Sequence, residues 1–150
     1  MSTLDDMRPH GETGSDLAGR VRLTVVRLYR RLRAEHGAGA LTGVQGSALD
    51  SLSRHGPLTP RELAACERIQ PPTMTRLIAS LEKAGLISRE SHPGDRRQHL
   101  LRLTPLGTKV FAETAYTTTH WFDLRLAELT PEERATLAAA VEVINKVAAG

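Results

Sequence analysis

The sequence predicts a mainly α-helical domain that carries one small β-hairpin, and three observations support this fold class. Apolar residues recur at three- and four-residue steps along most of the chain, as they do on one face of a helix. Threonine and proline stand where helices would begin, and glycine stands where several of them would end. Between residues 86 and 104 this period gives way to two short extended stretches around a polar turn.

The chain begins with a polar stretch that leads into an amphipathic helix. Residues 1–15 are mixed in charge and contain no apolar segment, so we expect a disordered arm and no secretory signal. A helix is predicted over 16–36, because it has one apolar stripe and is followed by Gly37. The stripe consists of Leu17, Val21, Val25, Leu28 and Leu32.

Two shorter helices follow, and each is opened by a threonine. Thr42 begins a capping box, in which side chains satisfy free backbone N–H groups, and this helix is expected to end at Gly56. Thr59 and Glu62 repeat the pattern, with proline at the first helical position, where its missing N–H costs nothing. This third helix is expected to end near residues 66–68.

The fourth predicted helix, which ends before Gly85, has two different faces. Its apolar stripe consists of Met74, Leu77, Ile78 and Leu81, and its opposite face consists of Pro72, Arg76, Ala79 and Lys83. The outer face is therefore small, polar and basic. Two short helices joined by a tight turn form a helix-turn-helix, whose second helix enters the major groove of DNA.

A hairpin completes a winged helix-turn-helix between residues 42 and 104. The extended stretches 86–92 and 98–104 flank the polar turn 93–97, which contains a Pro-Gly pair. This arrangement places arginines at the tip of the hairpin.

Two long helices are predicted within residues 105–150. Each is opened by a Thr-Pro pair, at Thr104 and at Thr130. The apolar stripe of the last helix consists of Leu137, Val141, Ile144 and Ala148. Because apolar stripes at both ends of the chain need a partner surface, we expect 16–37 and 105–150 to be dimerisation helices. Residues 16–150 then form a single domain, with 42–104 as its DNA-binding lobe.

Positive charge is concentrated in the middle of the chain. The 150 residues contain 20 Lys and Arg and 17 Asp and Glu, a net charge of +3. Residues 54–109 hold ten basic and five acidic residues, so this segment alone carries +5. A surface of this kind binds a polyanion and releases its counterions, which makes double-stranded DNA the expected partner.

Other classes of function find little support in the sequence. No apolar run approaches the roughly 20 residues that span a membrane, and the single cysteine, Cys66, cannot form an intramolecular disulfide, so we expect a cytoplasmic protein. Cys66 is expected to be an inert core residue and not a redox sensor. The six histidines lack metal-site spacing, and no phosphate loop or nucleophile elbow is present. We therefore expect no metal, no cofactor and no enzymatic activity.

The combination of motifs resembles the multiple antibiotic resistance regulator (MarR) family. The resemblance rests on the runs 70–87, 93–97 and 103–107, and it extends from Asp16 to Ala148. It implies an obligate homodimer in which the first, fifth and sixth helices interlock and each winged helix-turn-helix reads half of a pseudo-palindrome. It also implies a small, often aromatic or phenolic, effector that binds between the dimer helices and the DNA-binding lobe.

The resemblance assigns roles to the hairpin. Arg97 matches the family's wing arginine, which enters the minor groove, and Asp95 would hold the loop in shape. Arg96 at the tip and Arg89 on the strand are expected to meet phosphates, which adds affinity and salt dependence but no sequence choice.

The expected major-groove residues lie in the N-terminal half of the fourth helix: Pro72, Thr73, Thr75 and Arg76. Arginine bonds a guanine edge, threonine meets a thymine methyl group, and Pro72 would bring the backbone close. Two alternatives stay open, namely a surface ion pair of Arg76 with Glu82 or Asp95, and a Thr75 that merely caps or packs.

Together these features predict a homodimeric transcriptional regulator, a repressor that a small aromatic or phenolic ligand releases from a pseudo-palindromic promoter site. Leu28, Leu49 and Phe111 are candidates for lining the ligand pocket, with plain core packing as the alternative for all three. The alternative function is a winged-helix adaptor that docks proteins without specific DNA binding. The basic wing favours DNA.

Overall fold

The computed structural model describes residues 14–37 and 40–149. The chain divides into two compact units, one that ends at Glu35 and one that begins at His36. The first unit consists of nearly all of α1 (Gly14–His36), which begins two residues earlier than predicted. The predicted disordered arm lies, up to residue 13, outside the described residues.

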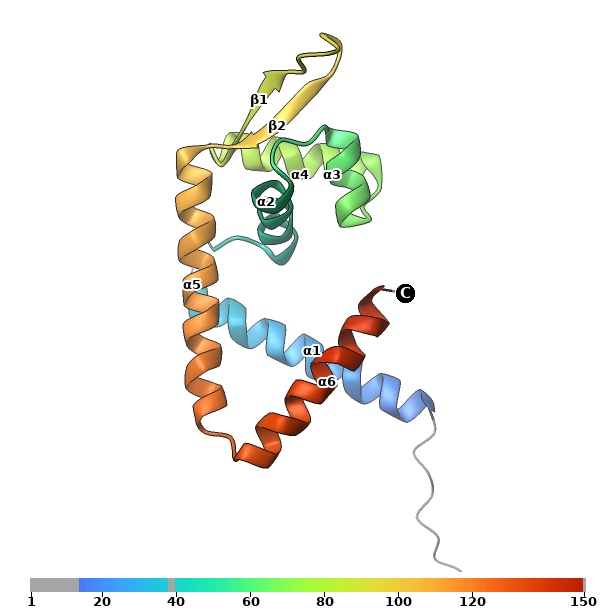
Figure 1. Cartoon of the computed structure of the whole chain (residues 1–150), viewed down its shortest axis with the longest axis vertical. Helices are drawn as coiled ribbons and strands as arrows, with labels where there is room; N and C mark the ends of the chain where they lie inside the picture. The colour runs from blue at the N-terminus through green and yellow to red at the C-terminus, as the bar shows by residue number, and fades with distance from the viewer. Residues whose placement is uncertain (1–13, 38–39, 150) are drawn as a thin grey trace, which may run out of the picture. The chain divides into compact units, whose positions relative to one another are not determined.

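The second unit holds the remaining elements in the predicted order (Figure 1). They are α2 (Gly43–His55), α3 (Pro60–Glu67), α4 (Pro71–Lys83), β1 (Ile87–Ser91), β2 (His99–Leu103), α5 (Pro105–Ala127) and α6 (Pro131–Ala149). The strands form an antiparallel hairpin in which Ile87 pairs with Leu103 and Ser91 with His99. The predicted fold class, a mainly helical chain with a winged helix-turn-helix, is confirmed.

The predicted threonine caps open α2 and α3. The Thr42 hydroxyl accepts a hydrogen bond from the Gln45 backbone N–H, and the Gln45 side chain accepts one from the Thr42 N–H. In α3 the Glu62 carboxylate accepts from the Thr59 N–H at 2.7 Å, and Thr59 Oγ1 accepts from the Glu62 N–H at 3.2 Å. Both helix starts are thus fixed by residues three positions apart in the sequence.

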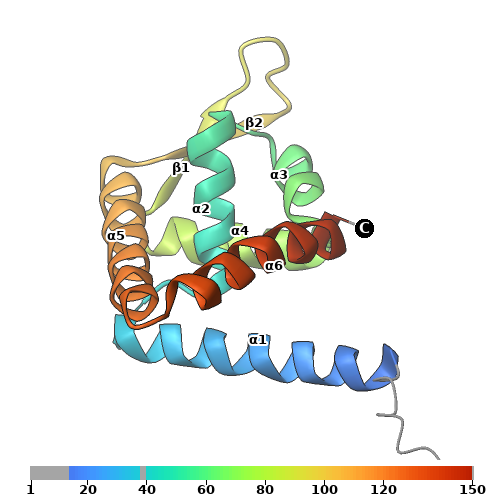
Figure 2. The ribbon, with the colours of Figure 1, turned by 60° about the horizontal axis from the view of Figure 1, so that its bottom comes forward.

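One apolar core holds the winged lobe together. Its fully buried large side chains come from all three lobe helices and the hairpin: Leu49, Leu63, Met74, Ile78, Leu81 and Leu101. The segment between α2 and α3 joins the hairpin, because Leu58 and Leu101 exchange backbone hydrogen bonds of 3.2 and 2.7 Å. Helix α2 lies between α3 and α5 (Figure 2), and Phe111 of α5 packs against the same core.

Two sequence expectations change once burial is known. Cys66 is exposed, so the expectation that it is a core residue is wrong. In the short helix α3 only Leu63 is fully buried against the core, and Cys66, in its last turn, stays in solvent. Leu49 has no exposed surface and is part of the core. This matches core packing, the alternative to a ligand contact at this residue.

Replacing Thr59 by alanine is expected to lower the free energy of unfolding by about 1–2 kcal/mol, because the cap that it forms with Glu62 is lost. Thr59 is 9% exposed, whereas the equivalent Thr42 is exposed. Thr42→Ala is therefore the matched control, with an expected cost below about 1 kcal/mol. Urea unfolding followed by circular dichroism measures both, and equal midpoints for the two variants would contradict the importance of the buried cap.

Candidate nucleic-acid interface

Helix α4 turns one face to the core and leaves the other open. Met74, Leu77, Ile78 and Leu81 are buried, whereas Pro72, Thr73, Thr75 and Arg76 are exposed. The Thr75 hydroxyl donates a hydrogen bond to the Pro71 carbonyl oxygen at 3.0 Å. The oxygen of this hydroxyl can still accept a hydrogen bond from another group. Within the described residues, Arg76 has neither an ion pair nor a hydrogen bond. The two alternative partners, Glu82 and Asp95, bind Arg89 and Arg97 instead.

The wing loop is organised by the Asp95 carboxylate. Its Oδ1 accepts from the Arg97 backbone N–H at 3.0 Å and from Arg97 Nε at 3.2 Å, and its Oδ2 accepts from Gln98 Nε2 at 3.2 Å. The hydrogen bonds from Arg97, first from its backbone and then from its side chain, lower the pKa of Asp95. The Arg97 side chain is nevertheless 91% exposed, so most of it projects into solvent from a fixed base.

Arg89 has a partner inside the protein. Its Nε and Nη2 donate to the two carboxylate oxygens of Glu82 at 2.6 and 3.0 Å, a bidentate contact that raises the pKa of Arg89. The contact ties β1 to the last turns of α4. Arg89 is thus held against α4, and a guanidinium already paired with a carboxylate has less to offer a phosphate.

Two residues beside this surface were not singled out from the sequence. Arg61 is exposed in the first turn of α3 and, within the described part of the chain, has no ion pair or hydrogen bond. With Arg97 it lines a hollow of about 300 Å³ at the base of the wing. A cation in the first turn of a helix opposes the helix dipole, and that mismatch is the signal that could have indicated it. His92 is the other residue, and its ring accepts hydrogen bonds from the wing turn.

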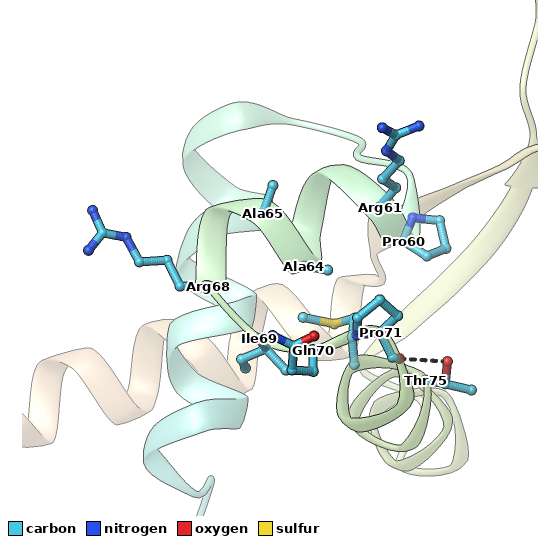
Figure 3. Close-up of a pocket in the computed structure, with 10 residues that line it drawn as sticks. Pro60, Arg61, Ala64, Ala65, Arg68, Ile69, Gln70, Pro71 and Thr75 are labelled. Carbon is cyan, nitrogen blue, oxygen red and sulfur yellow. Dashed lines mark hydrogen bonds between the residues drawn. The ribbon is translucent and has the colours of Figure 1, made fainter.

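A pocket of about 540 Å³ lies between α3 and α4 (Figure 3). Its lining is formed by Pro60, Arg61, Ala64, Ala65, Arg68, Ile69, Gln70, Pro71, Met74 and Thr75. Figure 3 shows the guanidinium groups of Arg61 and Arg68 at opposite ends, both pointing away from the apolar floor. None of the expected ligand residues lines this pocket.

Metal sites and membrane-spanning helices are both absent from the described ranges 14–37 and 40–149. These residues contain no group of three histidine, cysteine or acidic side chains that could hold a metal ion. None of their helices combines the length and the apolarity that crossing a membrane requires.

An exposed polar face on α4, an arginine-bearing wing and a core shared by both define a winged helix-turn-helix DNA-binding domain. The MarR family model matches residues 41–99, which include α2, α3, α4 and most of the hairpin. The chain belongs to the MarR family of transcriptional regulators.

Related proteins agree with this assignment over nearly the whole chain. An HTH-type transcriptional regulator of Mycobacterium tuberculosis is 36% identical over 133 residues, which cover 89% of this chain and 93% of the relative. The crystal structure of RV1404 from Mycobacterium tuberculosis matches with a TM-score of 0.76 at 27% identity, over 93% of this chain and 97% of that one. Wild-type MarR from Escherichia coli matches with a TM-score of 0.70 at 25% identity, over 84% and 95%.

The comparisons confirm that the chain is a DNA-binding transcriptional regulator and not an enzyme.

Acid is expected to destabilise the lobe through the two carboxylates whose pKa values are lowered, those of Glu62 and Asp95. The backbone hydrogen bond from Thr59 is the main cause for Glu62, and that from Arg97 for Asp95. A lowered pKa in the folded state adds stability above the unfolded value, about 4 for both groups, and this stability is lost as the pH falls through the folded value. The contribution of these two carboxylates to the urea midpoint should therefore be constant from about pH 8 to 5. The midpoint should then decrease as the pH is lowered below about 4. The double variant E62Q/D95N should show a shallower fall, and an identical acid profile would contradict this cause.

Proposed function

We propose that the chain is a homodimeric repressor that occupies a pseudo-palindromic promoter site, with α4 in the major groove and the wing in the minor groove. One observation carries the proposed interface. Of the eight arginines between residues 40 and 104, five have an ion-pair or hydrogen-bond partner in the described structure. The three without one are Arg61, Arg76 and Arg96, which lie on α3, on α4 and at the tip of the wing. Unneutralised charge is thus gathered on the elements that a winged helix-turn-helix turns to DNA.

Each residue has a proposed role in this complex. Arg76 bonds a guanine edge, and Thr73 and Thr75 meet neighbouring bases, while Pro72 allows the backbone to approach. Arg97 enters the minor groove beside Asp95. Arg61 and Arg96 contact phosphates on either side of the wing, with Arg89 a weaker contributor because Glu82 holds it.

Dimerisation is supported by apolar side chains that the single chain leaves in solvent. In the described part of the chain α6 has no buried residue, and Val143, Ile144 and Val147 are 59%, 50% and 76% exposed. Helix α1 exposes Leu17, Val21, Leu23, Val25, Val26, Leu28 and Tyr29. Apolar faces of this extent need a cover, and a second copy related by a two-fold axis supplies the same faces in return.

Ile144→Glu is expected to raise the dimer dissociation constant at least about 10-fold, because a carboxylate would be buried at the apolar face. Light scattering combined with size exclusion measures the mass. Ala139→Glu is the matched control, since Ala139 is exposed on the opposite side of α6 from Ile144 and places the same charge there. If the two variants have equal dimer dissociation constants, the dimer interface does not include the Ile144 face of α6.

Release by a small aromatic or phenolic ligand completes the proposal. The dimer has conformations whose lobe spacing does not fit DNA. A ligand that binds these conformations more tightly increases their population, so the dimer dissociates from the promoter. Leu28 and the half-buried Phe111 stay candidates for lining its site, whereas Leu49 acts as a core residue. Titration of phenolic acids into the DNA complex tests this step, and a complex unaffected by any of them at millimolar concentration would count against it.

The experiment that tests the DNA-binding proposal is selection from random genomic fragments at rising salt concentration. A dimer with two-fold symmetry should retain a short inverted repeat whose half-sites lie about one helical turn, roughly 10 base pairs, apart. Binding that disappears uniformly with salt, with no enriched sequence, would favour the protein-docking adaptor instead.

A further inference from the structure

The turn of the wing is built around the imidazole of His92. Its Nδ1 lies 3.0 Å from the backbone nitrogen of Gly94 and 3.1 Å from that of Asp95. Both nitrogens carry hydrogen, so Nδ1 accepts both bonds and the ring holds its own hydrogen on Nε2. A Cβ added to Gly94 would lie 3.4 Å from Cε1 of this ring, which shows how closely the ring and the turn approach.

The same turn positions the residues that follow it. The Gln98 N–H donates to the Asp95 carbonyl oxygen at 2.9 Å, and the His92 N–H donates to the Gln98 carbonyl oxygen at 3.1 Å, which closes the loop onto the hairpin. The Asp95 carboxylate then holds the backbone and Nε of Arg97. A continuous series of hydrogen bonds therefore runs from the His92 ring through Asp95 to Arg97.

We propose that His92 is a positioning residue for DNA binding, which fixes the backbone of the wing turn and thereby presents Arg97 to the minor groove in one orientation. This inference rests on the proposed role of Arg97. A loop that is already ordered loses less conformational freedom when it binds, so the ring raises affinity without touching DNA. Its acceptor does the work that an asparagine oxygen does in an Asx turn, where the side chain accepts from a backbone N–H two residues ahead.

The binding test uses the full-length chain and the DNA site recovered by the genomic selection. His92→Ala removes the acceptor and is expected to weaken binding about 3- to 10-fold, the range for loss of a hydrogen-bonded turn. His92→Asn keeps an acceptor at the same place and should bind within about 2-fold of the unchanged chain. In the Arg97→Ala background, His92→Ala should have no further effect, because the residue through which it acts is gone.

A measurement without DNA separates this proposal from the proposed function. Amide hydrogen exchange at Gly94 and Asp95 should be about 10-fold faster in His92→Ala and unchanged in His92→Asn. If Arg97→Ala leaves DNA binding intact, the proposed role of the wing arginine fails, and the exchange rates still decide whether His92 orders the turn. Equal exchange in all three chains, full affinity of His92→Ala, or an effect of His92→Ala that adds to that of Arg97→Ala would each overturn the inference.

Discussion

Replacing Gly107 by alanine is expected to lower the free energy of unfolding of the winged lobe by about 3 kcal/mol or more, the range of severe overpacking. Gly107 is buried in the first turn of α5. A Cβ built there would overlap the carbonyl oxygen of Leu86 and lie 2.8 Å from its carbonyl carbon. These are backbone atoms, and the same oxygen accepts a 3.0 Å hydrogen bond from the Thr104 N–H, so neither side can move aside. Thermal and urea unfolding measure the effect.

Gly46→Ala provides the matched control for this prediction. Gly46 lies within α2, and a Cβ built there meets nothing within 4 Å. Alanine inside a helix is more stable than glycine by roughly 0.5–1 kcal/mol, so the same substitution should stabilise the chain at this position. A Gly107→Ala chain with an unchanged midpoint would show that α5 and the backbone of Leu86 can separate without loss of the fold.

Replacing Arg97 by alanine is expected to weaken binding to the selected DNA site at least about 30-fold, because each of two wings would lose a contact of about 1–3 kcal/mol. The guanidinium projects from a loop that Asp95 and Gln98 hold in place, so its removal deletes a prepared contact. Arg97→Lys should recover only part of the loss, since lysine lacks the planar fork of donors. Fluorescence anisotropy measures the affinities.

Arg134→Ala is the control for charge alone. Arg134 lies in the first turn of α6, which follows the end of α5 remote from the hairpin (Figure 1). Its loss changes the net charge by the same amount but should alter affinity by no more than about 2- to 3-fold, because distant exposed charges are screened. Light scattering should find a dimer for both variants. Dissociation of the Arg97→Ala dimer would make that residue structural.

Much of the fold could be predicted from the sequence because its signals are local. The pair Thr59 and Glu62 fixes the start of α3 through contacts three residues apart, and the same applies to Thr42 in α2. The stripe on α4 identified its buried residues for the same reason, since helical spacing alone decides which side chains share a face. The outline of the candidate interface followed from these elements.

The remaining features depend on contacts that sequence spacing does not determine. Arg89 finds Glu82 because the hairpin folds back beside α4, and this packing decides which arginines stay unpaired. Cys66 is exposed because the short helix α3 buries only Leu63 against the core. The ring of His92 is different, because it contacts backbone nitrogens only two and three residues ahead; the sequence indicated only a loop there because histidine is not among the usual turn-forming residues.

Helix α4 and the wing are expected to read a specific DNA sequence together. The most direct test compares the affinity of the dimer for the selected inverted repeat with its affinity for a scrambled duplex of the same length and composition, at physiological salt. The expected ratio is about 10³ or more, and Arg76→Ala should lower it, because the variant discriminates less at one base position of each half-site. A ratio near 1, or a ratio that both Arg76→Ala and Arg97→Ala leave unchanged, would contradict specific reading by α4 and the wing.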